Sequence, residues 1–381
     1  MKNGFPFHAY RSTAAWRLLP LLLAVLVMAL IAGGCSDEEN TDVTQTPFPE
    51  PELQPWLLDV WGTGPDDVYV VGQPNVLLHW NGSAWTLVDG IGPDVLTAVW
   101  GTGTGTVYAV GHGGAILRGS GTSFTGMASG TEENLYDVGA GPYDAIYAVG
   151  EKGAIRRLSG NTWVSTQQLA YRYSDQDVAL DTLVLNEDIQ SLTTVNPYGL
   201  AGDHASVLME NDIPAYDHEW LWGAISDTTG FIKAGAYGDA LEDTYLGNKL
   251  GRVLRLVDDP ADGLTWELLA DANGDEARPA TFPQAISGLW FDAANARLLI
   301  TTSAGRIGSL MTDGSASEIL YADTAWLSSV WGAGNGEIWA CGKEGVVLYS
   351  DDDGLTWTQV EVPLPDTSGK SGIGKYGRLD P

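Results

Sequence analysis

The chain has 381 residues, a net charge of −30 at neutral pH and 44% hydrophobic residues, among them 15 tryptophans and 15 tyrosines. So acidic a surface repels phosphate backbones, which excludes nucleic-acid binding, and so many aromatic residues exclude a disordered chain. The 48 glycines indicate many turns rather than long helices, and two cysteines are too few for a disulfide scaffold.

The first 34 residues have the features of an export signal. They contain three basic residues and no acidic ones, and an apolar run from Leu18 to Gly34 ends directly before Cys35. This run of about 17 residues includes Pro20, so it is shorter than the ~20 residues that a membrane-spanning helix needs. A basic start, a short apolar stretch and small residues at its end predict a secretory signal peptide over residues 1–34.

The residues around Cys35 indicate lipid attachment. Ile31-Ala32-Gly33-Gly34-Cys35 is similar to the lipobox of bacterial lipoproteins, although Ala32 stands where these proteins usually have leucine. The resemblance implies that Cys35 is acylated, and that the exported chain is anchored at a bacterial outer membrane or cell surface, or faces the periplasm. The alternative is a plain secretion signal in which Cys35 has no special role.

Residues 35–55 are acidic and rich in proline, and they contain few apolar side chains. Such a segment cannot form a core, so we interpret it as a flexible tether. A folded β-domain is expected over residues 56–365, followed by a flexible C-terminal tail over residues 366–381.

An internal repeat predicts the fold class. Trp61, Trp100 and Gly139 lie 39 residues apart, and the same interval separates the members of three further series. These series are Tyr69, Tyr108 and Tyr147; Gly82, Gly121 and Gly160; and Trp85, Phe124 and Trp163. Looser copies begin at Leu192, Leu221 (interrupted by residues 239–250) and Ser287, and a regular copy begins at Ser328, which makes seven copies.

Each copy contains four short runs of β-branched and aromatic residues separated by glycines or small polar residues, which is typical of a four-stranded antiparallel meander. Seven such sheets, stacked around an axis so that each covers its neighbours, predict an all-β, seven-bladed β-propeller. A different division of residues 168–219 would give six or eight blades. Trp61 and its equivalents are expected to pack between the blades.

The last copy carries a further motif. Ser350, Asp352, Gly354, Thr356 and Trp357 fit the pattern S-x-D-x-G-x-T-W, which is similar to the Asp-box (BNR repeat) of sialidase-like propellers. The run V-W-G-x-G-x-x-x-V-Y-A-V-G also resembles secreted bacterial propellers related to the photosystem II assembly factor group. The resemblance implies that the box locks the turn between the third and fourth strands, so that these five residues have a structural role.

Catalysis of the sialidase type requires three arginines that converge on a carboxylate ligand, a tyrosine–glutamate pair and an aspartic acid. Arg118, Arg157 and Arg255 occupy one repeat position, so they are expected at separate places around the ring, and the F-R-I-P motif is missing. We therefore predict that the protein is not an enzyme. A sialidase-like glycoside hydrolase that uses two of the many carboxylates is the alternative.

The sequence contains no P-loop, dinucleotide fingerprint or nucleophile elbow, so no cofactor is expected. No metal site is expected from the histidines, which lie at no ligand spacing. Asp271, Asn273 and Asp275 are similar to the start of a calcium loop but lack its glycine and distal glutamate. A calcium-dependent carbohydrate binder is therefore a third possibility.

The ligand is expected on the face that carries the turns between second and third strands and the links between blades, as in related propellers. These turns vary in sequence on a repeated scaffold, which is where specificity can change without disturbing the core. Tyr171-Arg172-Tyr173, in the long segment 168–190, is a cluster of a type favoured in interfaces. The candidate binding residues are His112, Glu151, Asp203, His204, Tyr237, Tyr171, Arg172 and Tyr173.

These observations together predict a non-catalytic binding or assembly module at the bacterial cell envelope, attached to the membrane through its N-terminal lipid. The expected partner is a protein, a peptide or a glycan. The chain is expected to be monomeric.

Overall fold

The structure, a computed structural model, describes residues 54–365 apart from 141–144, 166–168, 174–178, 185–188, 194–198, 203–205, 211–219, 225–231, 238–242, 260–262, 271–283 and 316. The chain divides into two units, Met1–Pro51 and Glu52–Pro381, and all described residues belong to the second. The predicted signal peptide, Cys35 and the C-terminal tail lie outside the described residues. None of the helices in the described part is both long enough and apolar enough to cross a membrane.

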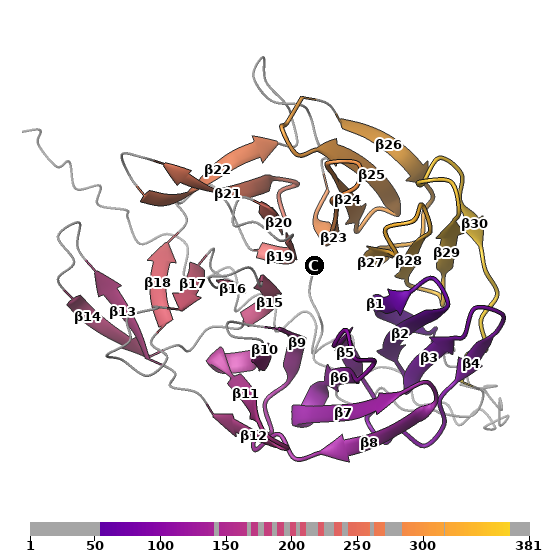
Figure 1. Cartoon of the computed structure of the whole chain (residues 1–381), viewed down its shortest axis with the longest axis horizontal. Coiled ribbons are helices and arrows are strands. Elements are labelled where there is room, and N and C mark those ends of the chain that lie inside the picture. Colours follow the sequence, from indigo (N-terminus) through magenta and orange to yellow (C-terminus); the bar gives the residue numbers. More distant parts are fainter. Residues whose placement is uncertain are drawn as a thin grey trace, which may run out of the picture. The chain divides into compact units, whose positions relative to one another are not determined.

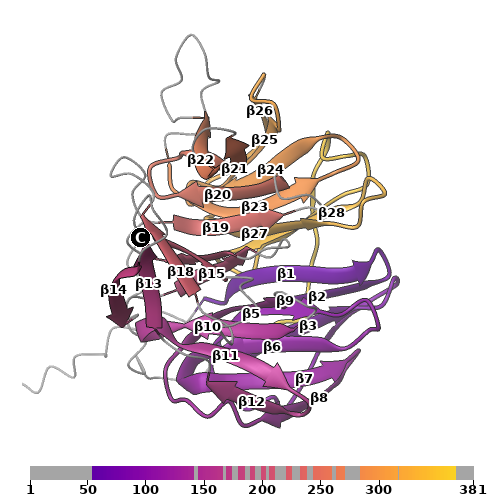
Figure 2. The same ribbon diagram turned by 60° about the vertical axis from the view of Figure 1, so that its left-hand side comes forward.

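The described strands form seven sheets, of which six have four antiparallel strands in chain order. The innermost strand of each sheet contacts the innermost strand of the next, and the last sheet contacts the first, so the seven sheets close into a ring. Figure 1 shows these sheets as blades around one axis, and Figure 2 shows the strands of neighbouring blades from the side. The protein is a seven-bladed β-propeller, which confirms the predicted fold.

The first three blades follow the repeat of the sequence. Blade 1 contains β1 (Trp56–Gly64), β2 (Asp67–Gln73), β3 (Val76–Trp80) and β4 (Trp85–Leu87). Blade 2 contains β5 (Leu96–Gly101), β6 (Val107–Gly111), the short 3₁₀ helix η1 (His112–Gly114), β7 (Ala115–Ser120) and β8 (Ser123–Met127). Blade 3 contains β9 (Leu135–Ala140), β10 (Ile146–Gly150), η3 (Glu151–Gly153), β11 (Ile155–Ser159) and β12 (Thr162–Ser165).

The last three blades have four strands each. Blade 5 contains β19 (Ile232–Tyr237), β20 (Thr244–Asn248), β21 (Val253–Asp259) and β22 (Gly263–Ala270). Blade 6 contains β23 (Ile286–Asp292), β24 (Arg297–Thr302), β25 (Arg306–Met311) and β26 (Ser317–Ala322). Blade 7 contains β27 (Leu327–Gly332), β28 (Ile338–Gly342), β29 (Val347–Ser350) and β30 (Thr358–Gln359).

Blade 4 differs from the others because a hairpin is added to its outer edge. Its own strands are β15 (Ile189–Thr193), β16 (Gly199–Gly202), β17 (Ser206–Glu210) and β18 (Trp220–Ala224). The hairpin consists of β13 (Leu169–Tyr173) and β14 (Ala179–Val184), and β13 pairs with β18 in parallel. The long segment 168–190 therefore extends a blade and adds none.

The expected start of the fifth copy at Leu221 is wrong. Leu221 lies on β18, the fourth strand of blade 4, and blade 5 begins with β19. Residues 239–250, which were expected to be an insertion, contain β20, the second strand of that blade. The apolar Leu-Trp-Gly run of β18 matches an innermost strand in composition, but pairing places it between β17 and the added hairpin, as the fourth strand of blade 4.

A tryptophan of one blade packs on a glycine of the next blade, which explains the repeated Trp-Gly dipeptide. A Cβ atom added to Gly101 of blade 2 would lie 2.6 Å from the Trp61 ring of blade 1, and one added to Gly62 would lie 2.7 Å from the Trp331 ring of blade 7. Gly332 meets the Trp290 ring in the same way. Because these contacts leave no space for a side chain, the dipeptide sets the distance between neighbouring blades.

Burial is highest in the second strands and lowest at the rim. The second strands β6 and β28 are buried at every position because blades cover both of their faces, whereas β8 and β30 are mostly exposed. The cores lie between the blades: Tyr69 and Leu77 of blade 1, for example, form one cluster with Val107 of blade 2. Cys341 is a buried free thiol in β28, and burial raises its pKa well above the ordinary value.

The ring closes between blades 7 and 1 without a shared sheet, since each of these blades is built from one continuous segment. On the innermost strands, Asp59 accepts hydrogen bonds from Ser329 Oγ of blade 7 (2.7 Å) and from Val99 N of blade 2 (2.9 Å). Although Asp59 keeps some contact with solvent, the protein crowds its carboxyl group, and this burial raises its pKa to about 6 despite the hydrogen bonds. One carboxylate thus connects three blades.

Candidate functional site

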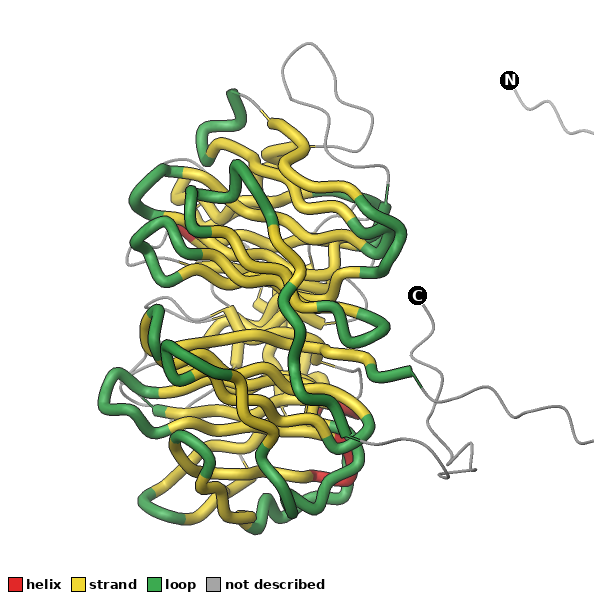
Figure 3. The backbone as a smooth tube through the Cα atoms, turned by 90° about the vertical axis from the view of Figure 1, so that its right-hand side faces the viewer, coloured by secondary structure: helices red, strands yellow, loops and turns green. Residues whose placement is uncertain are grey.

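The turns of the blades lie on two opposite faces of the ring, as the green segments in Figure 3 show. One face, here named the link face, carries the turns between second and third strands and the links between blades. Backbone hydrogen bonds join these segments, from Glu151 N to Asn134 O (2.8 Å) and from Lys343 N to Trp326 O (2.8 Å), for example. The other face, named the pocket face, carries the turns between first and second strands and between third and fourth strands.

Two of the predicted binding residues lie on the link face of adjacent blades. His112 begins η1 in blade 2, and Glu151 begins η3 in blade 3. Burial lowers the pKa of His112, an effect that the charge of Glu151 opposes, and the Nε2 atom of His112 has no hydrogen-bond partner among the described residues. Glu151 accepts a hydrogen bond from Asn134 N at 3.4 Å. This part of the link face therefore carries a neutral imidazole and a carboxylate at neutral pH.

The remaining predicted residues do not join this pair. Tyr237 ends β19, the first strand of blade 5, so its predicted place in a turn between second and third strands is wrong. Tyr171, Arg172 and Tyr173 lie on β13 in the added hairpin of blade 4. The other predicted residues, Asp203, His204, Asp271, Asn273, Asp275 and Cys35, lie outside the described residues.

The link face also carries an aromatic cluster that the sequence analysis did not single out. The rings of Trp56 and Trp326 meet edge to face with centroids 5.6 Å apart, and Lys343 Nζ lies 4.2 Å from the first centroid and 4.4 Å from the second. An ammonium group is attracted to the face of an indole ring. The cluster therefore connects blade 7 to blade 1, and its tryptophans, each at the start of a blade, were the signal in the sequence.

The pocket face is hollowed between blades 6 and 7. A pocket of about 220 Å³ lies between the turn after β23, the turn after β27 and the turn after β29. This is less than the roughly 300–1,000 Å³ typical of pockets for drug-sized ligands, so the pocket has the size for one side chain. Its lining includes Trp290, Asn295, Asn335, Glu337, Ile338 and Asp353.

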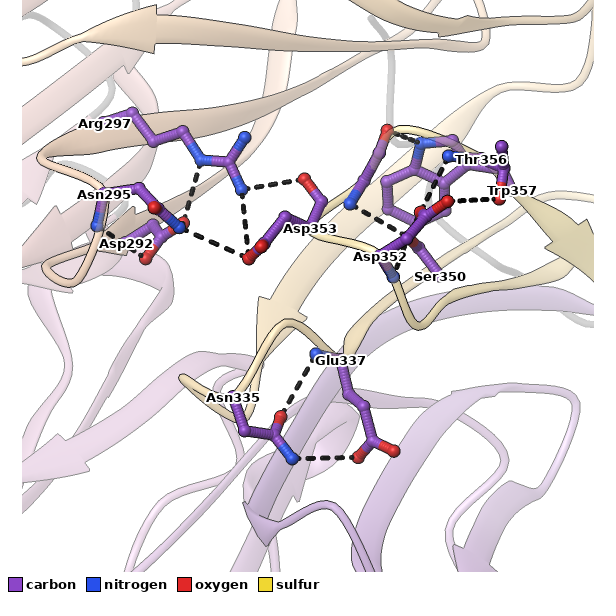
Figure 4. Close-up of polar contacts among 11 residues, drawn as sticks. Asp292, Asn295, Arg297, Asn335, Glu337, Ser350, Asp352, Asp353, Thr356 and Trp357 are labelled. Atoms are coloured by element: carbon purple, nitrogen blue, oxygen red, sulfur yellow. Dashed lines mark hydrogen bonds and ion pairs between the residues drawn. The ribbon is translucent and has the colours of Figure 1, made fainter.

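A buried ion pair forms one wall of the pocket. Arg297 Nε donates to Asp292 Oδ2 at 2.8 Å, and the two side chains are only 10% and 4% exposed. The same guanidinium donates to the carbonyl oxygen of Asp353 at 2.8 Å, which joins blade 6 to the turn after β29 (Figure 4). Asn295 Nδ2 donates to Asp292 Oδ2 (2.9 Å) and to Asp353 Oδ1 (3.3 Å). The positive charge of Arg297 is therefore balanced by the carboxylate of Asp292 within the protein.

Glu337 forms the opposite wall, and its hydrogen-bond donors are neutral groups. Tyr349 Oη donates to Glu337 Oε1 at 3.0 Å, and Asn335 Nδ2 donates to Oε2 at 3.4 Å. Burial, followed by the hydrogen bond to Glu337 and the charges of Glu337 and Asp351, raises the pKa of Tyr349 to about 12, so the phenol keeps its proton at neutral pH. No ion pair with a cationic side chain is found for Glu337 among the described residues.

The turn after β29 holds the five residues of the Asp-box pattern. Ser350 Oγ accepts a hydrogen bond from Gly354 N (2.9 Å), and Asp352 accepts from both N and Oγ1 of Thr356 (2.8 and 2.7 Å). These hydrogen bonds lower the pKa of Asp352, and Trp357 Nε1 donates to Gly354 O (2.9 Å). The hydrogen bonds of Asp352 remain within the turn, and they hold the adjacent Asp353 at the pocket.

The arrangement needed for sialidase-type catalysis is not found among the described residues. Arg118, Arg157 and Arg255 lie on β7, β11 and β21, the third strands of three different blades. Arg118 binds Asn161 (3.0 Å), and Arg255 pairs with Glu267 (3.2 Å). In the part of the chain that the structure describes, no three histidine, cysteine, aspartate or glutamate side chains are grouped to hold a metal ion.

Solved β-propellers resemble most of this chain. YCF48 from Cyanidioschyzon merolae has a TM-score of 0.56 at 15% identity and covers 80% of this chain and 97% of its own. The WD40 β-propeller domain of Doa1 has a TM-score of 0.55 at 13% identity, covering 79% and 94%, and YCF48 bound to D1 peptide has 0.54 at 13%, covering 79% and 95%. At these identities the likeness shows the fold. Neither a protein-family model nor a curated protein matches the sequence.

Proposed function

We propose that the protein is a non-catalytic binding or assembly module whose propeller holds a segment of another protein on the pocket face, and not on the link face where the sequence analysis predicts the ligand. The observation that carries this proposal is the pocket between blades 6 and 7, which has the size of one side chain, an aromatic residue in its lining and carboxylates on two sides. A protein of the same fold, YCF48, has a structure with a bound peptide. This supports a peptide segment as the ligand.

We further propose that a lipid on Cys35 attaches the module to the bacterial cell envelope. The proposal rests on the basic start, the short apolar run and the Gly33-Gly34-Cys35 sequence. Residues 36–55 would then form a tether, so the pocket face could meet a partner at the membrane surface. The Cys35→Ser variant should move from the membrane fraction to the soluble fraction of the envelope, and it should lose incorporation of labelled palmitate. Unchanged fractionation and labelling would refute the anchor and leave the binding role intact.

A glycoside hydrolase is the competing function because Glu337 and Asp353 place two carboxylates at one pocket. Two observations favour binding over hydrolysis. A pocket for one side chain is small for a sugar flanked by two catalytic carboxylates. The residues that line it include no arginine, and the neighbouring Arg297 is paired with Asp292 inside the protein.

Site-specific photo-crosslinking in cells tests the binding role. A photoreactive amino acid at Asn335, which is exposed at the pocket, should give a defined adduct with one protein partner. The matched control position is Ser83, which is exposed on the pocket face of blade 1 and should give no such adduct. Equal adducts from both positions, or no adduct from Asn335, would refute the proposal. Turnover of glycosides by the purified chain would then support the hydrolase.

A further inference from the structure

We propose that the pocket between blades 6 and 7 binds the side chain of an arginine of the partner protein. This inference rests on the proposed function and names the chemistry by which the module recognises its partner. It follows from the charge of the pocket, from the residues that line it and from the ion pair that Arg297 forms beside it.

The charge of the pocket is negative. Asp292 and Arg297 neutralise each other at 2.8 Å in the wall. Glu337 and Asp353 add two further carboxylates, and the same guanidinium forms a longer ion pair with Asp353, from Nη2 to Oδ1 at 3.9 Å. Three carboxylates therefore share one arginine. The Asp353 side chain is 56% exposed, so its carboxylate is accessible to an incoming group. A cationic ligand is therefore favoured and an anionic one is disfavoured.

The lining of the pocket suits a side chain with an apolar stem and a planar cationic end. Trp290 and Ile338 provide apolar surface, and Gly334 and Gly336 leave room beside them. A Cβ atom added to Gly336 would lie 3.5 Å from Asp353 Oδ1, so the glycine-lined side of the pocket lies close to this carboxylate. A guanidinium group stacks on aromatic rings and binds carboxylates with two parallel hydrogen bonds, whereas an ammonium group offers neither geometry.

The hydrogen bonds inside the pocket leave acceptors for such a ligand. Tyr349 and Asn335 each donate one hydrogen bond to Glu337, so both carboxylate oxygens keep a further lone pair. Asn335 Oδ1 accepts from Glu337 N at 3.1 Å, which holds the turn after β27 in place. The carboxylate is therefore positioned before the ligand arrives, and little conformational entropy is lost on binding.

The test is titration of the full chain, labelled with 5-fluorotryptophan, with acetyl-Gly-Ser-Arg-Ser-Gly-amide. The Trp290 fluorine resonance is assigned with the Trp290→Phe variant. The arginine peptide should shift this resonance, the lysine peptide should do so with weaker affinity, and the uncharged citrulline peptide should leave it unchanged. Raising the salt concentration should weaken binding, because the Debye length falls from roughly 10 Å at 0.1 M to 3 Å at 1 M.

Carboxamide variants identify the groups responsible. Glu337→Gln should weaken binding by about tenfold, and Asp353→Asn by about threefold because Asp353 is more exposed. Asn tolerates the positive φ of 60° at position 353, so the turn should keep its shape. The control is Asp351→Asn, which removes a carboxylate from the same turn outside the pocket lining and should have little effect.

The inference is overturned if the citrulline peptide binds as well as the arginine peptide, if Glu337→Gln binds like the wild type, or if the arginine peptide leaves the Trp290 resonance unmoved at millimolar concentration. If the photo-crosslink from Asn335 forms in cells in any of these cases, the proposed binding function is retained and only the proposed recognition of arginine is wrong. If the crosslink also fails, the proposed function fails with it.

Discussion

Blades 1 and 7 place a carboxylate at the same position, before the first core residue of the second strand, but they give it different partners. In blade 1, Asp67 lies 2.8 Å from Nε2 of His79, a group that becomes a cation when it is protonated. In blade 7, Glu337 receives its hydrogen bond from Tyr349, a neutral phenol. Both partners pack against the aromatic residue of the second strand: the Tyr69 and His79 rings are stacked with centroids 4.7 Å apart, and the Trp339 and Tyr349 rings are tilted by 41° with centroids 4.4 Å apart.

The difference shows how one scaffold position serves two purposes. In blade 1 the carboxylate also accepts a hydrogen bond from Thr63 Oγ1 at 2.6 Å, so its interactions are completed within the protein. In blade 7 the carboxylate lines a pocket and has neutral donors only. A change of the partner residue from histidine to tyrosine therefore distinguishes a structural carboxylate from one available to a ligand.

The largest effect is expected from the glycines at which blade 7 packs on blade 6 and blade 1 packs on blade 7. Gly332→Ala and Gly62→Ala would force a methyl group into the Trp290 and Trp331 rings, respectively. Each should lower the free energy of unfolding by about 2–3 kcal/mol, because a packed junction has no room for the added atom. Urea denaturation of the two variants measures this. The control is Gly126→Ala, where an added Cβ has no neighbour within 4 Å; a loss there equal to the other two would contradict the packing argument.

A second effect is expected at the junction between blades 7 and 1, from the titration of Asp59. Its pKa is about 6 in the folded protein, against an ordinary value of 3.8 for an aspartate, so the folded state binds the proton more tightly than the unfolded chain. The free energy of unfolding should therefore decrease by on the order of 2 kcal/mol as the pH rises from 4 to 7. Asp59→Asn should remove this component. Parallel pH profiles of stability for the wild type and the variant would show that burial does not control this carboxyl group.

A third effect tests the comparison of the two carboxylates directly. Tyr349→His gives Glu337 the partner that Asp67 has in blade 1, and an unperturbed histidine titrates near pH 6.5. Binding of the arginine peptide should then become about threefold to tenfold weaker at pH 5.5 than at pH 8, because the protonated imidazole competes with the ligand for Glu337. The reciprocal variant, His79→Tyr, should leave peptide binding unchanged. Equal binding by Tyr349→His at both pH values would refute the distinction drawn above.

The smallest effect is expected on the link face. Lys343→Met should lower the free energy of unfolding by roughly 0.5–1 kcal/mol, the contribution of a partly exposed cation–π contact. The contact energy is measured by a double-mutant cycle with Trp326→Leu, in which the loss caused by the lysine change should become smaller. Full additivity of the two changes would show that the ammonium group gains nothing from this ring.

The sequence by itself determined the all-β class, the repeat and the packing of Trp61 and its equivalents between the blades. The class and the repeat are local features, because strand periodicity and turn glycines recur in each copy of about 39 residues. The stacking of blades follows from them, since a four-stranded sheet can bury both of its faces only between two other sheets. The order of strands in blades 4 and 5 was misassigned, since Leu221 and its neighbours have the composition of an innermost strand. Pairing with β17 and with the added hairpin decided their place instead.

The tertiary structure alone decided where the pocket lies. Trp290 and Asp353 are far apart in the sequence, and they meet because blades 6 and 7 stack and because their turns emerge on the same face. The contact of Asp59 with Ser329, 270 residues apart, likewise exists only in a closed ring. Local propensity specifies each strand and turn, but the juxtaposition of side chains from different blades results from closure, which no single repeat encodes.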